Sequence, residues 1–158
     1  MFRSSTCRAS VAALFFSLLI AIPTEVARAH GDPVKVVTTT EDLADIARAI
    51  GGDHVAVTSL TTGAIDYHHV VARPSMIASV RDAQVYVEIG LELEIWSAQI
   101  LESAGNNAVM GSAPGHVVAS SGITPLEVPE RVTRADGDVH ASGNPHVWLD
   151  PVNAIQIA

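Results

Sequence analysis

Short β-branched runs alternate with segments of helical spacing through the first two thirds of the chain, and this alternation restricts the fold more than any other feature. The runs at 34–39, 54–60 and 84–89 have the composition of strands. The segments 41–50 and 74–83 carry apolar residues at helical spacing after an N-cap or proline signal. Strands that alternate with helices form parallel sheets covered by helices on both faces. We therefore predict an α/β fold, with a parallel sheet flanked by helices.

The next segment, 91–104, has apolar residues on one helical side and Gly105 as a stop signal, which predicts a helix. Glu92 and Glu94 are expected to be exposed on it. The runs 116–119 and 123–126 fit short strands or loop equally well.

Towards the C-terminus the pattern is more polar. Residues 129–144 predict an exposed loop, and 151–158 predict the first two turns of a helix. Outside the motifs described below, we expect His30, His54 and His116 to be solvated.

Residues 1–29 predict a secretory signal peptide. Arg3 and Arg8 precede an uncharged apolar run of 12 residues at 11–22, and 27–29 is a small-x-small cleavage site. The run is too short to span the hydrocarbon core of a membrane as a helix. We therefore expect a periplasmic protein.

The predicted mature chain, 30–158, contains no cysteine, because Cys7 precedes the apolar run. Thiolate metal sites are thereby excluded, and any metal must be held by imidazole and carboxylate. The mature chain has 6 basic and 16 acidic residues, a net charge near −10. This balance argues against nucleic acid and anionic membranes as partners and is compatible with cations.

Two histidines lie in segments that suit a binding site. His146 follows a proline and precedes a tryptophan in Asn144–Pro151, and such a rigid frame suits a metal ligand or a catalytic base. His68 lies in the loop 61–73, directly after a predicted strand. Binding residues gather beyond the carboxyl ends of parallel strands, so His68 and His146 are expected at the same edge of the sheet.

These histidines are 78 residues apart, so only a folded scaffold can bring them together. Neutral imidazole suits Zn²⁺ with oxygen ligands completing the shell, whereas Mn²⁺ accepts more carboxylate. Asp66 or Asp150 could fix the second ring nitrogen of a ligand histidine. Asp150 is equally good as a helix N-cap before Pro151.

Four motifs carry a resemblance to a known family. They are Asp66-Tyr67-His68, then Pro74-Ser75, then Gly90-Leu91-Glu92-Leu93-Glu94-Ile95-Trp96, then Asn144-Pro145-His146-Val147-Trp148-Leu149-Asp150-Pro151. In order and spacing the chain resembles the zinc- and manganese-binding substrate-binding proteins of ABC importers, the ZnuA/TroA-like group.

The resemblance implies two α/β lobes joined by a long helix, with the metal in the cleft between them. It implies that His68 and His146 are the ligands from the first lobe, and that a second lobe supplies a histidine or glutamate and an acidic residue. Because the chain stops before the joining helix, we expect residues 30–158 to be the N-terminal lobe only.

The chain departs from the family pattern at three places. Tyr67 stands where the family often has proline. His69 adds an imidazole beside His68, and we expect it to be a surface or second-shell group. The long His- and Asp-rich loop of many zinc-specific members is reduced to Asp136, Asp138 and His140, which leaves a small collecting loop and weakens the preference for zinc over manganese.

The predicted function is that of a periplasmic solute-binding protein that captures Zn²⁺, or Mn²⁺, and hands it to an ABC permease in the inner membrane. We expect a monomer without enzymatic activity. A zinc-dependent hydrolase is an alternative, although the chain has neither His-Glu-x-x-His nor Gly-x-Ser-x-Gly. A non-transporting metal buffer or adhesin-like protein is another.

Overall fold

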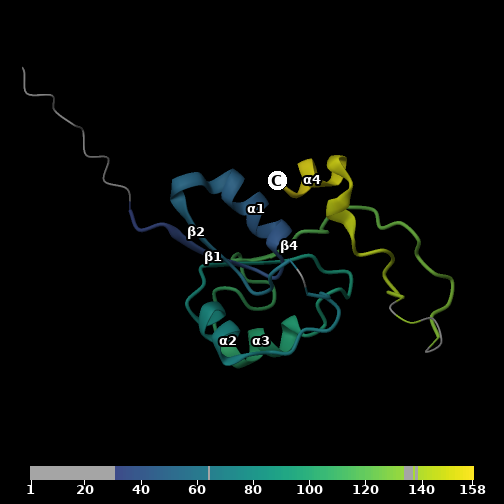
Figure 1. Cartoon of the computed structure of the whole chain (residues 1–158), viewed down its shortest axis with the longest axis horizontal. Coiled ribbons are helices and arrows are strands. Elements are labelled where there is room, and N and C mark those ends of the chain that lie inside the picture. The colour runs from purple at the N-terminus through teal and green to yellow at the C-terminus, as the bar shows by residue number, and fades with distance from the viewer. Residues whose placement is uncertain (1–30, 64, 134–136, 138) are drawn as a thin grey trace, which may run out of the picture.

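The computed structural model describes residues 31–63, 65–133, 137 and 139–158. The predicted signal peptide, His30, Asp136 and Asp138 lie outside these residues. Four parallel strands form one sheet in the order β2-β1-β3-β4 (Figure 1). The strands are β1 (Val34–Thr38), β2 (Val55–Ser59), β3 (Val85–Glu88) and β4 (His116–Val118), and the α-helices are α1 (Glu41–Gly51), α2 (Pro74–Arg81), α3 (Ser97–Ala104) and α4 (Pro151–Ile157).

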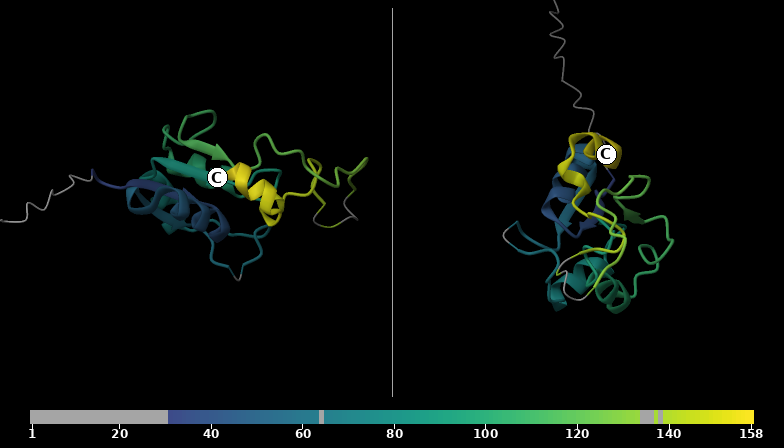
Figure 2. Two further views of the ribbon diagram at one scale, coloured as in Figure 1. Left: turned by 90° about the horizontal axis from the view of Figure 1, so that it is seen from above. Right: turned by 90° about the vertical axis from the view of Figure 1, so that its right-hand side faces the viewer.

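The helices cover both faces of this sheet. α1 and α4 lie on one face and α2 and α3 on the other (Figures 1 and 2). Each face has its own apolar core. The larger core is built around Tyr86, Val80 and Ile100, and the smaller one joins Leu43 to Ile89. The predicted α/β class and the parallel sheet are therefore confirmed.

Local signals explain where the helices begin and end. The Thr40 side chain accepts a hydrogen bond from the backbone N–H of Leu43 and caps α1, as the sequence predicts. α1 ends at Gly51, and Gly52 follows with φ +50°, a backbone conformation that glycine adopts at no steric cost. Among the described residues, no helix is long and apolar enough to cross a membrane.

The prediction of one helix over 91–104 is wrong for its first half. α3 begins only at Ser97, and the residues before it form turns. Leu91 has φ +51° and Glu92 has φ +65°, so neither can continue a right-handed helix. The apolar spacing was misleading because Leu93 and Trp96 are buried in the core, although they belong to turns and not to a helix.

The prediction that Glu94 is exposed is also wrong, although Glu92 is exposed as expected. The Glu94 side chain is buried and accepts hydrogen bonds from the Thr39 hydroxyl at 2.6 Å and from the backbone N–H groups of Ile89 and Gly90. Burial raises the pKa of Glu94, and these hydrogen bonds oppose that rise. Glu94 thereby ties the turn after β3 to the end of β1.

Of the two ambiguous runs, only the first contains a strand, β4, and 123–126 lies outside any strand. His116 was expected to be solvated, and this is wrong: its Nε2 lies 3.0 Å from Glu88 Oε1 and its Nδ1 lies 2.9 Å from the carbonyl oxygen of Gly111. His54 is exposed, as predicted.

Candidate metal site

The first histidine motif follows β2, in the loop that connects it to α2. Asp66 Oδ1 accepts two hydrogen bonds from His68, one from the backbone N–H at 3.0 Å and one from ring Nδ1 at 2.8 Å. An Nδ1 that donates to a carboxylate fixes the tautomer and leaves Nε2 as the lone-pair nitrogen. The His68 backbone N–H, followed by the side chains of His69 and His68, holds the pKa of Asp66 well below its usual range.

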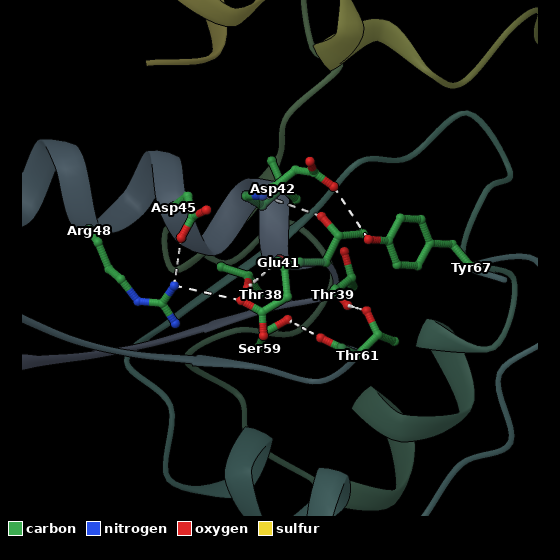
Figure 3. Close-up of polar contacts among 11 residues, drawn as sticks. Thr38, Thr39, Glu41, Asp42, Asp45, Arg48, Ser59, Thr61 and Tyr67 are labelled. Carbon is green, nitrogen blue, oxygen red and sulfur yellow. Dashed lines mark hydrogen bonds and ion pairs between the residues drawn. The ribbon is translucent and has the colours of Figure 1, made fainter. Parts of the chain in front are cut away.

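Tyr67 fixes this motif to the rest of the fold. Its hydroxyl donates to Asp42 Oδ2 at 3.3 Å, at the start of α1 (Figure 3). The Trp96 ring N–H donates to the Tyr67 carbonyl oxygen at 2.8 Å. Burial, and then the Asp42 carboxylate, raises the pKa of Tyr67. Tyr67 therefore anchors the segment by its side chain and by its backbone.

The second motif, Asn144-Pro145-His146, has the same local geometry. Asn144 Oδ1 accepts from the backbone N–H of His146 at 3.0 Å and from its ring Nδ1 at 2.9 Å. The segment is held by its own backbone, because Asn144 N–H donates to the Leu126 carbonyl at 2.8 Å. Pro145 and Val147 on either side of His146 are buried.

The two motifs meet at one end of the sheet. The Tyr67 and Trp148 rings make an edge contact with centroids 6.3 Å apart, and the His68 and His146 rings lie 5.7 Å apart. Burial, followed by His68 and His140, lowers the pKa of His146. A lowered pKa keeps an imidazole neutral, which is the form that binds a metal.

The other predicted residues occupy different positions. His140 lies directly against His68, with the two Nε2 atoms 3.1 Å apart. His69 is exposed, and its Nδ1 lies 3.1 Å from Asp66 Oδ2. Asp150 accepts a hydrogen bond from the Val152 N–H at 2.8 Å and is the N-cap of α4. Of the two roles that the sequence allowed for Asp150, this is the helix cap before Pro151.

The sequence analysis did not predict a role for Asn144. Its side-chain oxygen accepts hydrogen bonds from His146 as the Asp66 oxygen does from His68. The signal was available, because both histidines follow an Asx residue at the second position before them, and an Asx side chain readily accepts from the backbone two residues on. Within the described ranges, no set of three or more His, Cys, Asp or Glu side chains is already arranged to hold one metal ion.

Comparisons with known proteins establish the family of the chain. Residues 36–158 match the family described as zinc-uptake complex component A, periplasmic. The chain belongs to this family.

Among its relatives, the chain is 29% identical over 160 residues to a putative metal-binding protein of Treponema pallidum, covering 98% of this chain and 49% of that protein. It is 34% identical over 121 residues to the iron-binding protein YfeA of Yersinia pestis, covering 77% and 35%. A solved ZnuA deletion mutant with zinc bound is 31% identical, with a TM-score of 0.62 over 80% of this chain and 43% of that one. The chain thus spans half or less of the length of these relatives.

Proposed function

We propose that this protein is the metal-capturing component of an ABC importer, and that it binds Zn²⁺, with Mn²⁺ as the alternative, in the periplasm. The observation that carries the proposal is the pair His68 and His146. Each imidazole has its Nδ1 held by a neighbouring side-chain oxygen, and the two rings lie 5.7 Å apart. Two tautomers fixed in this way leave both Nε2 atoms available to one ion.

The chemistry of these donors favours zinc. Zn²⁺ takes imidazole nitrogen at ~2.0–2.1 Å in tetrahedral sites, whereas Mn²⁺ prefers oxygen ligands and higher coordination numbers. The carboxylate of Asp66 is engaged by His68 and His69, and that of Asp150 caps α4. Relatives of this chain include a high-affinity zinc uptake protein of Bacillus subtilis and manganese-binding lipoproteins, so both ions belong in the experiment.

We further propose that residues 30–158 form an N-terminal lobe, and that oxygen or nitrogen ligands outside this lobe complete the metal shell. Two imidazoles fill half of a tetrahedral Zn²⁺ shell. The bound ion would then pass to a permease in the inner membrane, and the binding protein would act as a monomer that catalyses no reaction. A hydrolase would need a general base near the ion, and the nearby carboxylate of Asp66 is already bound to two imidazoles.

Metal titration of three histidine variants tests this proposal. Zn²⁺ and Mn²⁺ affinities are measured by competition with a chromophoric chelator for the purified protein and for His68→Ala, His146→Ala and His54→Ala. His54 is exposed and outside both motifs, so it serves as the matched control.

We expect zinc to bind more tightly than manganese. Each ligand variant should lose about 100-fold or more in zinc affinity, beyond the ~10–100-fold that loss of an outer-shell partner costs, while the control stays unchanged. Tight binding that survives both ligand substitutions would disprove the proposal.

A further inference from the structure

Glu92 stands in a backbone conformation that its side chain disfavours. Its φ is +65°, in the left-handed region where glycine is the usual residue, and it lies in a turn with Gly90 at φ +85°. Strain of this kind persists where the surroundings hold it, and it is concentrated at functional sites. The Glu92 side chain reaches across the fold from this position, and its Oε2 accepts a hydrogen bond from the backbone N–H of Ala141 at 2.9 Å.

Ala141 belongs to a tight turn, His140–Gly143, that is also fixed at its far end. The backbone N–H of Gly143 donates to the His140 carbonyl oxygen at 3.1 Å. Gly143 has φ +99°, and a Cβ there would lie 2.7 Å from the Leu126 carbonyl oxygen, so the chain is packed closely at this point. The carboxylate of Glu92 and the packing of Gly143 therefore fix the backbone that carries His140.

The fixed turn places His140 where a metal ligand would stand. Its Nε2 lies 3.1 Å from Nε2 of His68, and the two rings stack with centroids 5.1 Å apart. Two imidazole nitrogens bound to one tetrahedral Zn²⁺ are about 3.3 Å apart, from the Zn–N distance of ~2.0–2.1 Å. The observed spacing is close to that value.

His140 also lines a cavity with each of the two proposed ligands. It lines a cavity of about 430 Å³ together with His68 and Glu92, and a second cavity of about 260 Å³ together with His146.

We propose that His140 is a third imidazole ligand for the same ion and that Glu92 is the positioning residue that holds it there. This inference rests on the proposed function and goes beyond the two histidines of that proposal. The three rings are adjacent but do not yet converge on one point. With His68 Nδ1 donating to Asp66, it is His140 Nε2–H that donates to His68 Nε2. Binding of the ion therefore requires the His140 ring proton to move to Nδ1, the two Nε2 atoms to part slightly, and His146 to turn towards them.

The first test compares His140→Ala with His54→Ala, which removes an exposed imidazole outside both histidine motifs. Zinc affinity is measured by chelator competition, and the visible absorption of bound Co²⁺ reports the ligand set. We expect about a tenfold or larger loss of zinc affinity and a changed Co²⁺ spectrum for His140→Ala, with little change for the control. An affinity and spectrum equal to those of the unaltered protein, or tighter binding, would overturn the assignment of His140.

The second test separates positioning from folding by two substitutions of Glu92. Glu92→Gly removes the carboxylate and places the residue that φ +65° favours, so its thermal midpoint should be unchanged or higher while zinc affinity falls about tenfold. Glu92→Gln keeps a side-chain oxygen that accepts from Ala141 and should restore affinity to within about threefold. Unaltered affinity in Glu92→Gly, or its unfolding, would overturn the positioning role.

Metal binding by the His68–His146 pair and ligation by His140 are tested by different variants. If His68→Ala and His146→Ala leave zinc binding unchanged, the proposed function itself is wrong. If those two variants lose binding while His140→Ala does not, only the third ligand is wrong.

Discussion

The two histidine motifs have the same hydrogen-bonding geometry but different chemistry. In each, a side-chain oxygen two residues before the histidine accepts from both its backbone N–H and its Nδ1. In the first motif that oxygen belongs to the carboxylate of Asp66, and in the second to the amide of Asn144. The comparison indicates that the position of the accepting oxygen orients the imidazole ring, and that a neutral amide oxygen can do this as well as a charged carboxylate oxygen.

The surroundings explain why the charges differ. Asp66 is exposed and receives His69 as well as His68, so its negative charge is solvated and shared. Asn144 uses its amide N–H to donate to Glu127 Oε2 at 2.7 Å, which a carboxylate could not do. The Asn144 amide therefore links His146 to Glu127, whereas an aspartate at position 144 would repel the Glu127 carboxylate.

The largest effect should come from removing either oxygen. Asp66→Ala and Asn144→Ala each free one Nδ1, and we expect each to lower zinc affinity by ~10–100-fold, the usual cost of losing an outer-shell partner of a metal ligand. Chelator competition measures this, with circular dichroism to confirm folding. If only one of the two variants loses affinity, the motifs are not equivalent.

Exchanging the two oxygens should have a smaller effect. Asp66→Asn keeps the acceptor and should cost less than about tenfold in zinc affinity, because a neutral amide supports the imidazole less than a carboxylate does. Asn144→Asp should destabilise the fold through repulsion of Glu127, by about 0.2–1 kcal/mol because the contact is exposed to solvent. The double variant Asn144→Asp/Glu127→Gln restores a donor and should recover that stability, and failure to recover it would assign the loss to another contact.

A third variant tests how firmly the first motif is anchored. Tyr67→Phe removes the hydrogen bond to Asp42 but keeps the ring against Trp148. We expect a loss of about 0.5–1.5 kcal/mol in the free energy of unfolding, measured by urea denaturation. Zinc affinity should change by less than about threefold, and a loss as large as that of Asp66→Ala would show that the tyrosine orients the ligand directly.

The smallest expected effect is on the thermal stability of the protein at acidic pH. The pKa of Asp66 is lowered from its ordinary value of 3.8, so its contribution to stability is present above that pH and is lost as the pH falls below it. Asp66→Asn should therefore lower the thermal midpoint slightly at pH 7, and the difference should shrink between about pH 4 and pH 2. A difference that grows on acidification would contradict the sign of this pKa shift.

The fold could be predicted largely from local patterns, and the failures have long-range causes. β-branched runs and capping signals located β1, β2 and β3 and the starts of α1, α2 and α4, whereas 116–119 was left open between strand and loop. The turn before α3 was missed because Leu91 and Glu92 adopt positive φ values that no helical periodicity reveals. Glu94 was misassigned because its partner Thr39 lies 55 residues away.

The candidate site could be predicted less completely. The motifs predicted His68 and His146 as ligands, but the sequence offered only Asp66 or Asp150 to fix the second ring nitrogen of a ligand histidine and named no partner for His146 in particular. The structure shows Asn144 in that place, and Asp150 at the N-cap of α4. His140 could be assigned only to a collecting loop, because its contact with His68 spans 72 residues.

The central claim is that Nε2 of His68 and Nε2 of His146 bind the same ion. A crystal structure of the zinc-loaded protein, with anomalous data at the zinc absorption edge, tests it most directly. We predict one strong anomalous peak ~2.0–2.1 Å from both Nε2 atoms, with Asp66 and Asn144 still bound to the Nδ1 atoms. A peak on His69 or His140 that leaves His146 without a bond to zinc would contradict the claim.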